Sequence, residues 1–214
     1  HGIRDVGCNF DEAEGMHTTS SLCGKEEAYA AFLAGILRRS LASQGGVRVR
    51  ELDNAYHLIA EELPFYRWRG ETWPYNAQVM PFAFITVAWN GGFSTFSPEL
   101  LGQPSQDFDN FILGNVTQSG YLESAQSNRF VKIWSAIVHG TRDCREHCAY
   151  FNYCGGGSPS NRLYEHGTLL SSETLYCRTT VKRPLEVVLD HLDTHVAKFS
   201  PQERGNLSSV AGVA

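Results

Sequence analysis

The chain has 214 residues, 42% of them hydrophobic and 19% charged, and a net charge of −5. This composition is that of a globular protein and excludes a wholly disordered chain, a coiled coil and a collagen-like repeat. The apolar runs are only a few residues long, so we expect no membrane span. The acidic balance gives no electrostatic reason to expect nucleic acid or an anionic membrane as a partner.

The first part of the chain predicts a strand and two helices. Residues 1–10 are strand-like, and residues 11–22 are polar with turn chemistry. Between residues 25 and 43 apolar side chains recur at three- and four-residue steps, which indicates an amphipathic helix ended by Gln44-Gly45-Gly46. Residues 47–50 fit a short strand or the approach to a second helix, which uses residues 52–63 and ends at Pro64.

The middle of the chain contains the clearest hairpin. Residues 64–81 have several prolines and no clear period, so we expect an ordered loop. Residues 82–89 and 93–96 alternate around Asn90-Gly91, which favours a tight type I′ turn with two central residues. Residues 97–120 are rich in loop-forming residues.

The last part predicts two more helices. Residues 128–139 carry an apolar face, and Pro184 stands where a helix can begin without losing a hydrogen bond. After Pro201 we expect a disordered tail. The interpretation is an α+β chain divided at the 64–81 segment into residues 1–63, 64–200 and a tail of residues 201–214.

The six cysteines are unevenly distributed. Cys8 and Cys23 stand alone near the start, and we expect both to be buried as small apolar side chains. The other four follow the spacing Cys144-x3-Cys148-x5-Cys154-x22-Cys177, with Gly155-Gly156-Gly157 directly after the third. Four grouped thiols without a secretion signal indicate a metal or redox site before they indicate disulfides.

Three uses of these thiols compete. Structural zinc usually takes closely spaced ligand pairs at both ends of its site, and here the second half offers one cysteine. An iron–sulfur cluster takes four thiolates, and three closely spaced cysteines on a loop with a fourth from further along fit that need. Glycines after the third cysteine would let backbone amides approach a cluster. The spacing favours a cluster, leaves zinc open, and favours purely structural thiols least.

The cysteine block is also similar to a known family. The run Cys144-Arg-Glu-His-Cys148-Ala-Tyr-Phe-Asn-Tyr-Cys154-Gly-Gly-Gly, followed by Glu173-Thr174-Leu-Tyr176-Cys177, resembles the C-terminal SPASM region of radical SAM peptide maturases. The resemblance is strongest to the GrrM-like branch, which forms cyclophane crosslinks in ribosomally made peptides. Shorter stretches at residues 2–15, 20–22, 96–102 and 114–116 also resemble that branch.

The resemblance implies a fold and a ligand set. The fold would be the last strand and helices of a partial (β/α) barrel, followed by a SPASM-like hairpin and cluster domain. Cys144, Cys148, Cys154 and Cys177 match the ligands of one auxiliary 4Fe–4S cluster. The additional cysteines of the family pattern are missing together, since residues 82–96 contain none and position 158 is serine. One complete auxiliary site is therefore expected.

The resemblance also implies a reaction. In the family, S-adenosylmethionine (AdoMet) is cleaved to a 5′-deoxyadenosyl radical, which takes a Cβ hydrogen from a precursor peptide, and the carbon radical then couples to an aromatic ring. The C-x3-C-x2-C triplet that binds AdoMet through a second 4Fe–4S cluster is absent from this chain. Because the chain also begins with His1, we expect a C-terminal part that is inactive alone, with AdoMet and that cluster in an N-terminal half.

The expected partners follow from the same interpretation. They are the precursor peptide and the N-terminal radical SAM half, in the cytoplasm, with the auxiliary cluster shaping the peptide site and accepting an electron. Glu14 and Glu99 are candidate peptide contacts, and Arg50 is a candidate to hold a carboxylate or AdoMet. A solvated turn is the simpler explanation for Glu14 and a surface ion pair for Arg50, whereas a turn cap is the alternative for Glu99. A zinc-binding peptide-recognition module without catalysis is the alternative.

Overall fold

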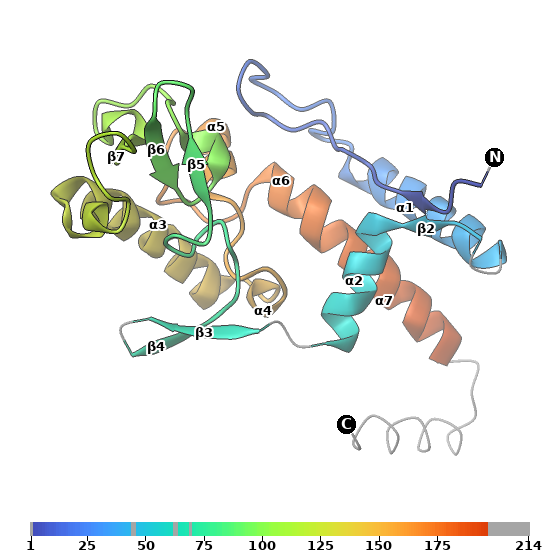
Figure 1. Ribbon diagram of the computed structural model, residues 1–214. Helices are drawn as coiled ribbons and strands as arrows, with labels where there is room; N and C mark the ends of the chain where they lie inside the picture. Colours follow the sequence, from blue (N-terminus) through green and yellow to red (C-terminus); the bar gives the residue numbers. More distant parts are fainter. Residues whose placement is uncertain (1, 44–45, 62–63, 69, 197–214) are drawn as a thin grey trace.

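A computed structural model describes residues 2–43, 46–61, 64–68 and 70–196. It confirms a mixed α+β fold, with helices around three small sheets (Figure 1). The tail prediction for residues 201–214 lies outside the described residues. Among the helices in the described ranges, none has the length and apolar character needed to cross a membrane.

The N-terminal part is a strand–helix–strand unit. β1 (Asp5–Val6) pairs in parallel with β2 (Arg48–Val49), and α1 (Glu26–Ala42) connects them. The 47–50 segment was predicted as a short strand or as the approach to a helix. It contains both, because α2 (Arg50–Ala60) begins directly after β2. The described residues contain one parallel pair of strands and no closed barrel. The predicted last strand and helices of a partial (β/α) barrel stay a prediction.

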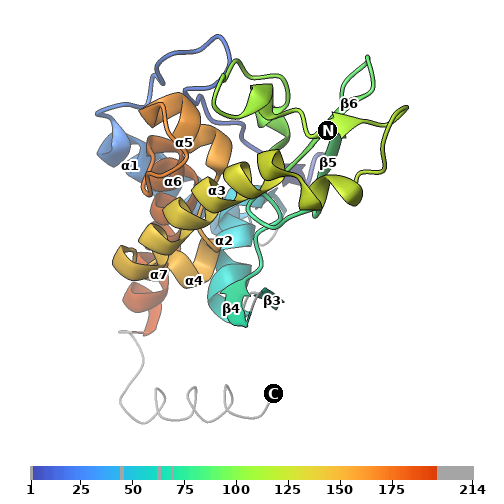
Figure 2. The same ribbon diagram turned by 90° about the vertical axis from the view of Figure 1, so that its left-hand side faces the viewer.

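The C-terminal helix returns to this N-terminal part. α7 (Arg183–Val196) packs against α1 and α2, and the three helices lie together in both views (Figures 1 and 2). Leu33, Leu52, Leu185 and Val188 form the centre of their shared core, each at most 2% exposed. Residues from opposite ends of the chain therefore build one helical lobe.

The prediction that the last helix opens at Pro184 is confirmed to within one residue, since α7 starts at Arg183, but this helix continues an earlier helical run instead of starting from a loop. The helical run starts at α6 (Leu175–Cys177) and continues through a π-helical segment (Arg178–Lys182) into α7. The N–H of Arg183 donates to the carbonyl of Arg178, five residues earlier. A π turn ahead of Pro184 lets the helix continue although this proline has no N–H to donate.

A second lobe combines a sheet with the longest helix. β5 (Ile85–Val87), β6 (Gly92–Thr95) and β7 (Gly114–Asn115) form an antiparallel sheet in that order. α3 (Asn128–His147) packs beside it, and the shared core includes Phe93, Phe96, Phe130 and Ile137. Three short 3₁₀ helices lie in the segment from β6 to α3: Pro98–Leu100, Asp109–Phe111 and Glu123–Gln126.

The predicted hairpin is confirmed, but its turn is different. The N–H of Ala88 donates to the carbonyl of Gly92 at 2.7 Å, so the loop contains three residues. Gly91 has a φ of +85°, whereas Asn90 does not have a positive φ. A type I turn followed by a left-handed glycine explains this loop better than the expected type I′ turn.

The prediction of a loop over residues 64–81 is wrong. β3 (Phe65–Trp68) and β4 (Glu71–Pro74) form an antiparallel hairpin, with Tyr66 opposite Trp73. Gly70 has a φ of +84°, which suits a tight connection between them. The hairpin is short and packs through a few aromatic side chains, so no alternating pattern marks it in the sequence.

The predicted helix over residues 128–139 is confirmed but continues further, to His147. The apolar period that predicted this helix ends at residue 139, and glycine in general weakens a helix. In the structure Gly140 lies inside α3, and a Cβ on it would stand only 2.4 Å from the carbonyl oxygen of Leu169. A glycine is needed here for close packing, and the helix therefore passes through it.

Candidate functional site

The four grouped cysteines line one cavity of about 370 Å³. Cys144 lies in the last turns of α3, and Cys148 is the residue at which that helix ends. Cys154 ends the short helix α4 (Phe151–Cys154), and Cys177 ends α6. The expectation that the first three lie on a loop is therefore wrong for Cys144, which is helical because α3 continues past Gly140.

Local structure fixes each position. The N–H of Cys148 donates to the carbonyl of Cys144 at 2.8 Å, so the first two cysteines are one helical turn apart. The side-chain oxygen of Thr174 accepts a hydrogen bond from the N–H of Cys177 at 3.0 Å and caps α6. The Glu165 carboxylate accepts hydrogen bonds from the backbone N–H groups of Leu175 and Tyr176 in the same turn.

The four cysteines differ in burial. Cys144 and Cys177 are 7% and 8% exposed, and Cys148 and Cys154 are half-buried. Burial raises the pKa of the Cys144 and Cys154 thiols, and raises that of Cys177 to about 12. All six cysteines are free of disulfides. Without a metal these buried thiols would stay protonated, so metal binding would have to release protons.

The four cysteines share a cavity but do not form a preassembled metal-ion site among the described residues. Among the described residues, no group of three or more His, Cys, Asp or Glu side chains has the arrangement of a metal-ion site. Four thiolates around one zinc ion each lie about 2.3 Å from it, which requires closely spaced sulfur atoms. The structure therefore shows four cysteines around one cavity and no preformed ion site among the described residues.

The triple glycine shapes the third cysteine. Gly155, Gly156 and Gly157 all have positive φ values, a conformation that other residues rarely adopt. The N–H groups of Gly156 and Gly157 hydrogen-bond to the Cys154 sulfur, which lowers its pKa, although burial has the larger, opposite effect. The expectation that these glycines bring backbone amides toward the site agrees with this geometry.

Asn76 is a contributor that the sequence did not reveal. Its Nδ2 donates to the carbonyls of Cys154, at 2.9 Å, and Gly157, at 2.8 Å. It therefore holds both ends of the glycine loop from a segment 78 residues away. An asparagine in a segment without a clear pattern gives no sequence signal for this role.

The hairpin β3–β4 forms a wall of the site. Trp73, Cys144 and Phe151 pack in one buried cluster, with the Trp73 and Phe151 rings edge to face at 6.2 Å. The Arg145 guanidinium lies over the Trp73 ring, 5.1 Å from its centre. The segment predicted as a loop is therefore the structure that covers Cys144.

A buried arginine lies beside the cysteines. Arg162, in α5 (Pro159–His166), is 0% exposed. Its Nη2 lies 3.6 Å from the Cys144 sulfur and also donates to the carbonyl of Gly156. Burial lowers the pKa of the Arg162 guanidinium, and the neighbouring cysteines raise it. Arginine nevertheless stays charged in proteins, so this is a buried cation in contact with Cys144.

A second cation lies at the rim of the cavity. Lys182 forms an ion pair with Glu173, and its ammonium lies 5.2 Å from the centre of the Tyr150 ring. The Tyr150 hydroxyl donates to Glu186 at 2.7 Å, which ties the rim to α7. Lys182 already has a carboxylate partner, unlike the buried arginine.

The other candidate residues lie outside this cavity. Arg50 forms an ion pair with Glu51 at 2.6 Å and donates to the carbonyl of Cys8, which agrees with the surface ion-pair explanation. Arg50 lines a separate cavity of about 330 Å³ with Cys8, Glu12 and Tyr176. None of the four grouped cysteines is among the residues that line this second cavity.

Glu14 and Glu99 are close to each other. Burial raises the pKa of the half-buried Glu14 to about 7, and the carboxylates of Glu12 and Glu99 add to the effect. Glu99 is exposed. The structure thus groups two of the three candidates, Glu14 and Glu99, and leaves Arg50 out.

The two isolated cysteines depart from expectation. Cys23 is exposed, in the turn before α1, and Cys8 is half-buried with its N–H donating to Glu51. Neither lines the four-cysteine cavity. The prediction that both are buried is wrong, because turn and strand-end positions at the surface offer too few neighbours to cover them.

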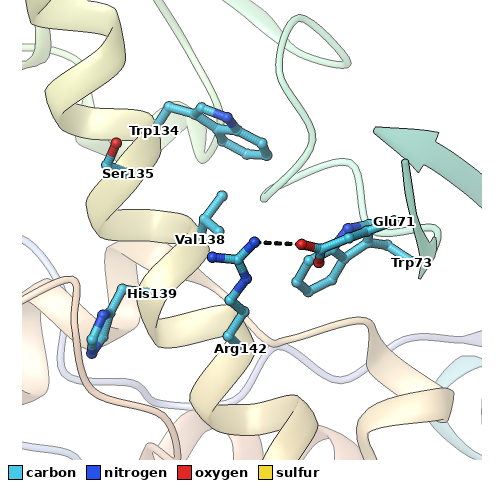
Figure 3. A pocket seen from close by; sticks show the side chains of 7 residues that line it. All are labelled: Glu71, Trp73, Trp134, Ser135, Val138, His139 and Arg142. Atoms are coloured by element: carbon cyan, nitrogen blue, oxygen red, sulfur yellow. Dashed lines mark hydrogen bonds and ion pairs between the residues drawn. The ribbon is translucent and has the colours of Figure 1, made fainter. Parts of the chain in front are cut away.

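Another hollow, of about 230 Å³, lies between α3 and β4 (Figure 3). Trp73 and Trp134 flank it, and Arg142 donates to Glu71 across it. The oppositely charged side chains that line this hollow, Arg142 and Glu71, form an ion pair with each other. The interaction joins the hairpin to α3 and thereby supports the wall over Cys144.

Comparisons with known proteins give one informative relationship. A Synechocystis protein described as uncharacterized protein sll1766 is 35% identical over 195 residues. The match covers 90% of this chain and 47% of the relative, so the chain spans about half the length of the protein it matches. No protein-family model matches the chain. No solved structure matches it.

Proposed function

We propose that the chain is the auxiliary-cluster part of a radical SAM/SPASM peptide maturase of the GrrM-like, cyclophane-forming branch. Cys144, Cys148, Cys154 and Cys177 hold one 4Fe–4S cluster. The observation that carries the proposal is the position of Cys177. It follows Cys154 by 23 positions in the sequence, yet it lines the same cavity as the other three cysteines.

The size and chemistry of the cavity support a cluster. Its volume of about 370 Å³ exceeds what one tetrahedral ion requires. Four cysteine thiolates are the usual ligands of a 4Fe–4S cluster. When bound, such a cluster supplies one-electron transfer and stabilises the segment that holds it.

The surrounding residues have separate tasks in this proposal. The hairpin β3–β4 excludes water from the Cys144 side through Trp73. Asn76 and the triple glycine fix Cys154. Thr174 and Glu165 hold the turn that presents Cys177. The chain thereby orients four thiolates from three helices toward one volume.

The whole-protein activity is part of the same proposal. A precursor peptide is the substrate, and the AdoMet site with its own 4Fe–4S cluster belongs to an N-terminal half, in a cytoplasmic enzyme. Glu14 and Glu99 are the candidate peptide contacts, because their carboxylates are close enough to interact electrostatically. The resemblance of the cysteine block supports this assignment, and the match to about half of a longer relative is compatible with it.

Metal analysis of the full 214-residue chain tests the proposal. After anaerobic reconstitution with iron and sulfide, we expect about four irons and four sulfides per chain and brown protein. Cys144→Ala, Cys148→Ala, Cys154→Ala and Cys177→Ala should each lose most of the iron, because an open ligand position exposes the cluster. Cys8→Ala and Cys23→Ala are the matched controls and should keep it.

Two results would contradict the assignment. Colourless protein with about one zinc per chain would favour the zinc-binding peptide-recognition module instead. Full iron content in Cys177→Ala, with loss in Cys8→Ala or Cys23→Ala, would show that the ligand set is wrong. Absorption spectra and iron content are measured on the same samples.

A further inference from the structure

Arg162 is the largest side chain in the described residues that is fully buried, and it is a cation. A buried charge is costly unless it is paired and hydrogen-bonded. Its Nη1 lies 3.5 Å from the carbonyl of Ile137, its Nη2 contacts Gly156 and Cys144, and its Nε has no partner. The guanidinium is therefore only partly satisfied by neutral groups.

The missing component is an anion. Within the described part of the chain, Arg162 forms no ion pair with a carboxylate, and the ionisable groups that act on it are Cys144, Cys154 and Cys177. Lys182 and Glu173 at the rim pair with each other. Protonated thiols would leave the guanidinium without a countercharge, whereas thiolates bound to a metal centre would supply one.

The fold reserves space for this cation. A Cβ on Gly140 would stand 2.6 Å from the Nη1 of Arg162 and 2.7 Å from the carbonyl oxygen of Ser171. A glycine inside a helix costs stability relative to alanine, by about 1 kcal/mol. At this position that cost allows the guanidinium and the 169–171 backbone to approach α3.

We propose that Arg162 is the fixed countercharge of the cluster and a positioning residue that raises its reduction potential. The inference rests on the proposed function. One-electron reduction adds a negative charge to the cluster, and a buried cation beside Cys144 stabilises that added charge more than it stabilises the oxidised form. The residue thus makes the cluster easier to reduce.

Redox titration of the reconstituted chain tests the proposal. Dithionite supplies the electron, and the midpoint is followed by absorption and electron paramagnetic resonance. We expect Arg162→Gln to lower the equilibrium constant for one-electron reduction of the cluster by about tenfold. This corresponds to a midpoint potential about 59 mV more negative. Arg162→Lys keeps the charge and should shift the midpoint by less than about half of that interval. Arg129→Gln, which removes an arginine of α3 from its ion pair with Asp109, is the matched control and should leave the midpoint unchanged.

The outcomes separate charge from packing. An unchanged midpoint in Arg162→Gln with full iron content overturns the proposal. If Arg162→Gln loses its iron, retention in Arg162→Lys supports a charge role, and equal loss in both variants overturns it. A wild-type chain that binds no iron contradicts the proposed function itself, and that result needs no variant.

Discussion

The four-cysteine cavity and the three charged candidates Glu14, Glu99 and Arg50 differ in how the fold treats their polar groups. In the cavity, Cys144, Cys177 and the guanidinium of Arg162 are buried, and backbone or side-chain hydrogen bonds fix their surroundings. Among the charged candidates, Glu99 is exposed, and Arg50 forms an ion pair with its chain neighbour Glu51.

The difference teaches which candidates carry information. Burying a cation is unfavourable unless something compensates, so the position of Arg162 beside Cys144 asks for an explanation. Exposed charges and surface ion pairs contribute little and cost little, so they arise without a functional cause. Substitutions at both places can sharpen or break this contrast.

The largest effect is expected for Gly140→Ala. The new Cβ would meet backbone oxygens of Leu169 and Ser171 and the Arg162 guanidinium, which outweighs the better helix propensity of alanine. We expect a loss of about 2 kcal/mol in the free energy of unfolding, measured by urea denaturation. Iron uptake should fall as well, because Arg162 must move.

Gly35→Ala in α1 is the matched control. A Cβ there would meet only the tip of Arg38 at 3.9 Å, so alanine should stabilise the protein by about 0.5–1 kcal/mol. If both alanine variants stabilise the protein, the close packing of Gly140 against the 169–171 backbone is wrong, and with it the reserved space for Arg162.

A smaller effect is expected for Asn76→Ala. Two backbone carbonyls beside Cys154 lose their donor, which costs about 1–2 kcal/mol. The reconstituted cluster should then lose iron faster to a chelator. Asn115→Ala also removes hydrogen bonds, but these join Asn115 to Asn90 and Thr117 and not to the cysteine segment. This variant should leave iron release unchanged. Equal rates of iron release in the two variants would contradict the prediction that Asn76 stabilises the cysteine site.

The smallest effect is expected for Glu14→Gln and depends on pH. Because the folded-state pKa of Glu14 is raised to about 7, its stabilising contribution is complete below its ordinary value of 4.5 and is lost as pH rises through 7. Glu14→Gln should therefore match wild type at pH 4 and be more stable at pH 8, by about 1 kcal/mol or less after solvent screening.

Urea denaturation at several pH values checks this prediction. Glu99→Gln should lower the pKa of Glu14 and move the pH-dependent loss to lower pH, since Glu99 is one of its causes. Glu146→Gln, on the exposed side of α3, should show no such shift. A constant stability difference between Glu14→Gln and wild type at all pH values would contradict the grouping of these carboxylates.

Regular local patterns made the helices and the central hairpin predictable from the sequence. The 25–43 and 128–139 periods correspond to α1 and the first part of α3, and Asn90-Gly91 marks the turn between β5 and β6. The cysteine spacing singled out Cys144, Cys148, Cys154 and Cys177, which line one cavity. The fold implied by the resemblance, the partial barrel and the cluster remain predictions.

Tertiary contacts decided the rest. The β3–β4 hairpin, the course of α3 through Gly140 and the role of Asn76 depend on partners tens of residues away, which a local pattern does not contain. The sequence by itself determined which residue types stand at which spacing. Only the packed structure determined that a buried arginine faces the cysteines, because burial removes water and makes every unpaired charge depend on its neighbours.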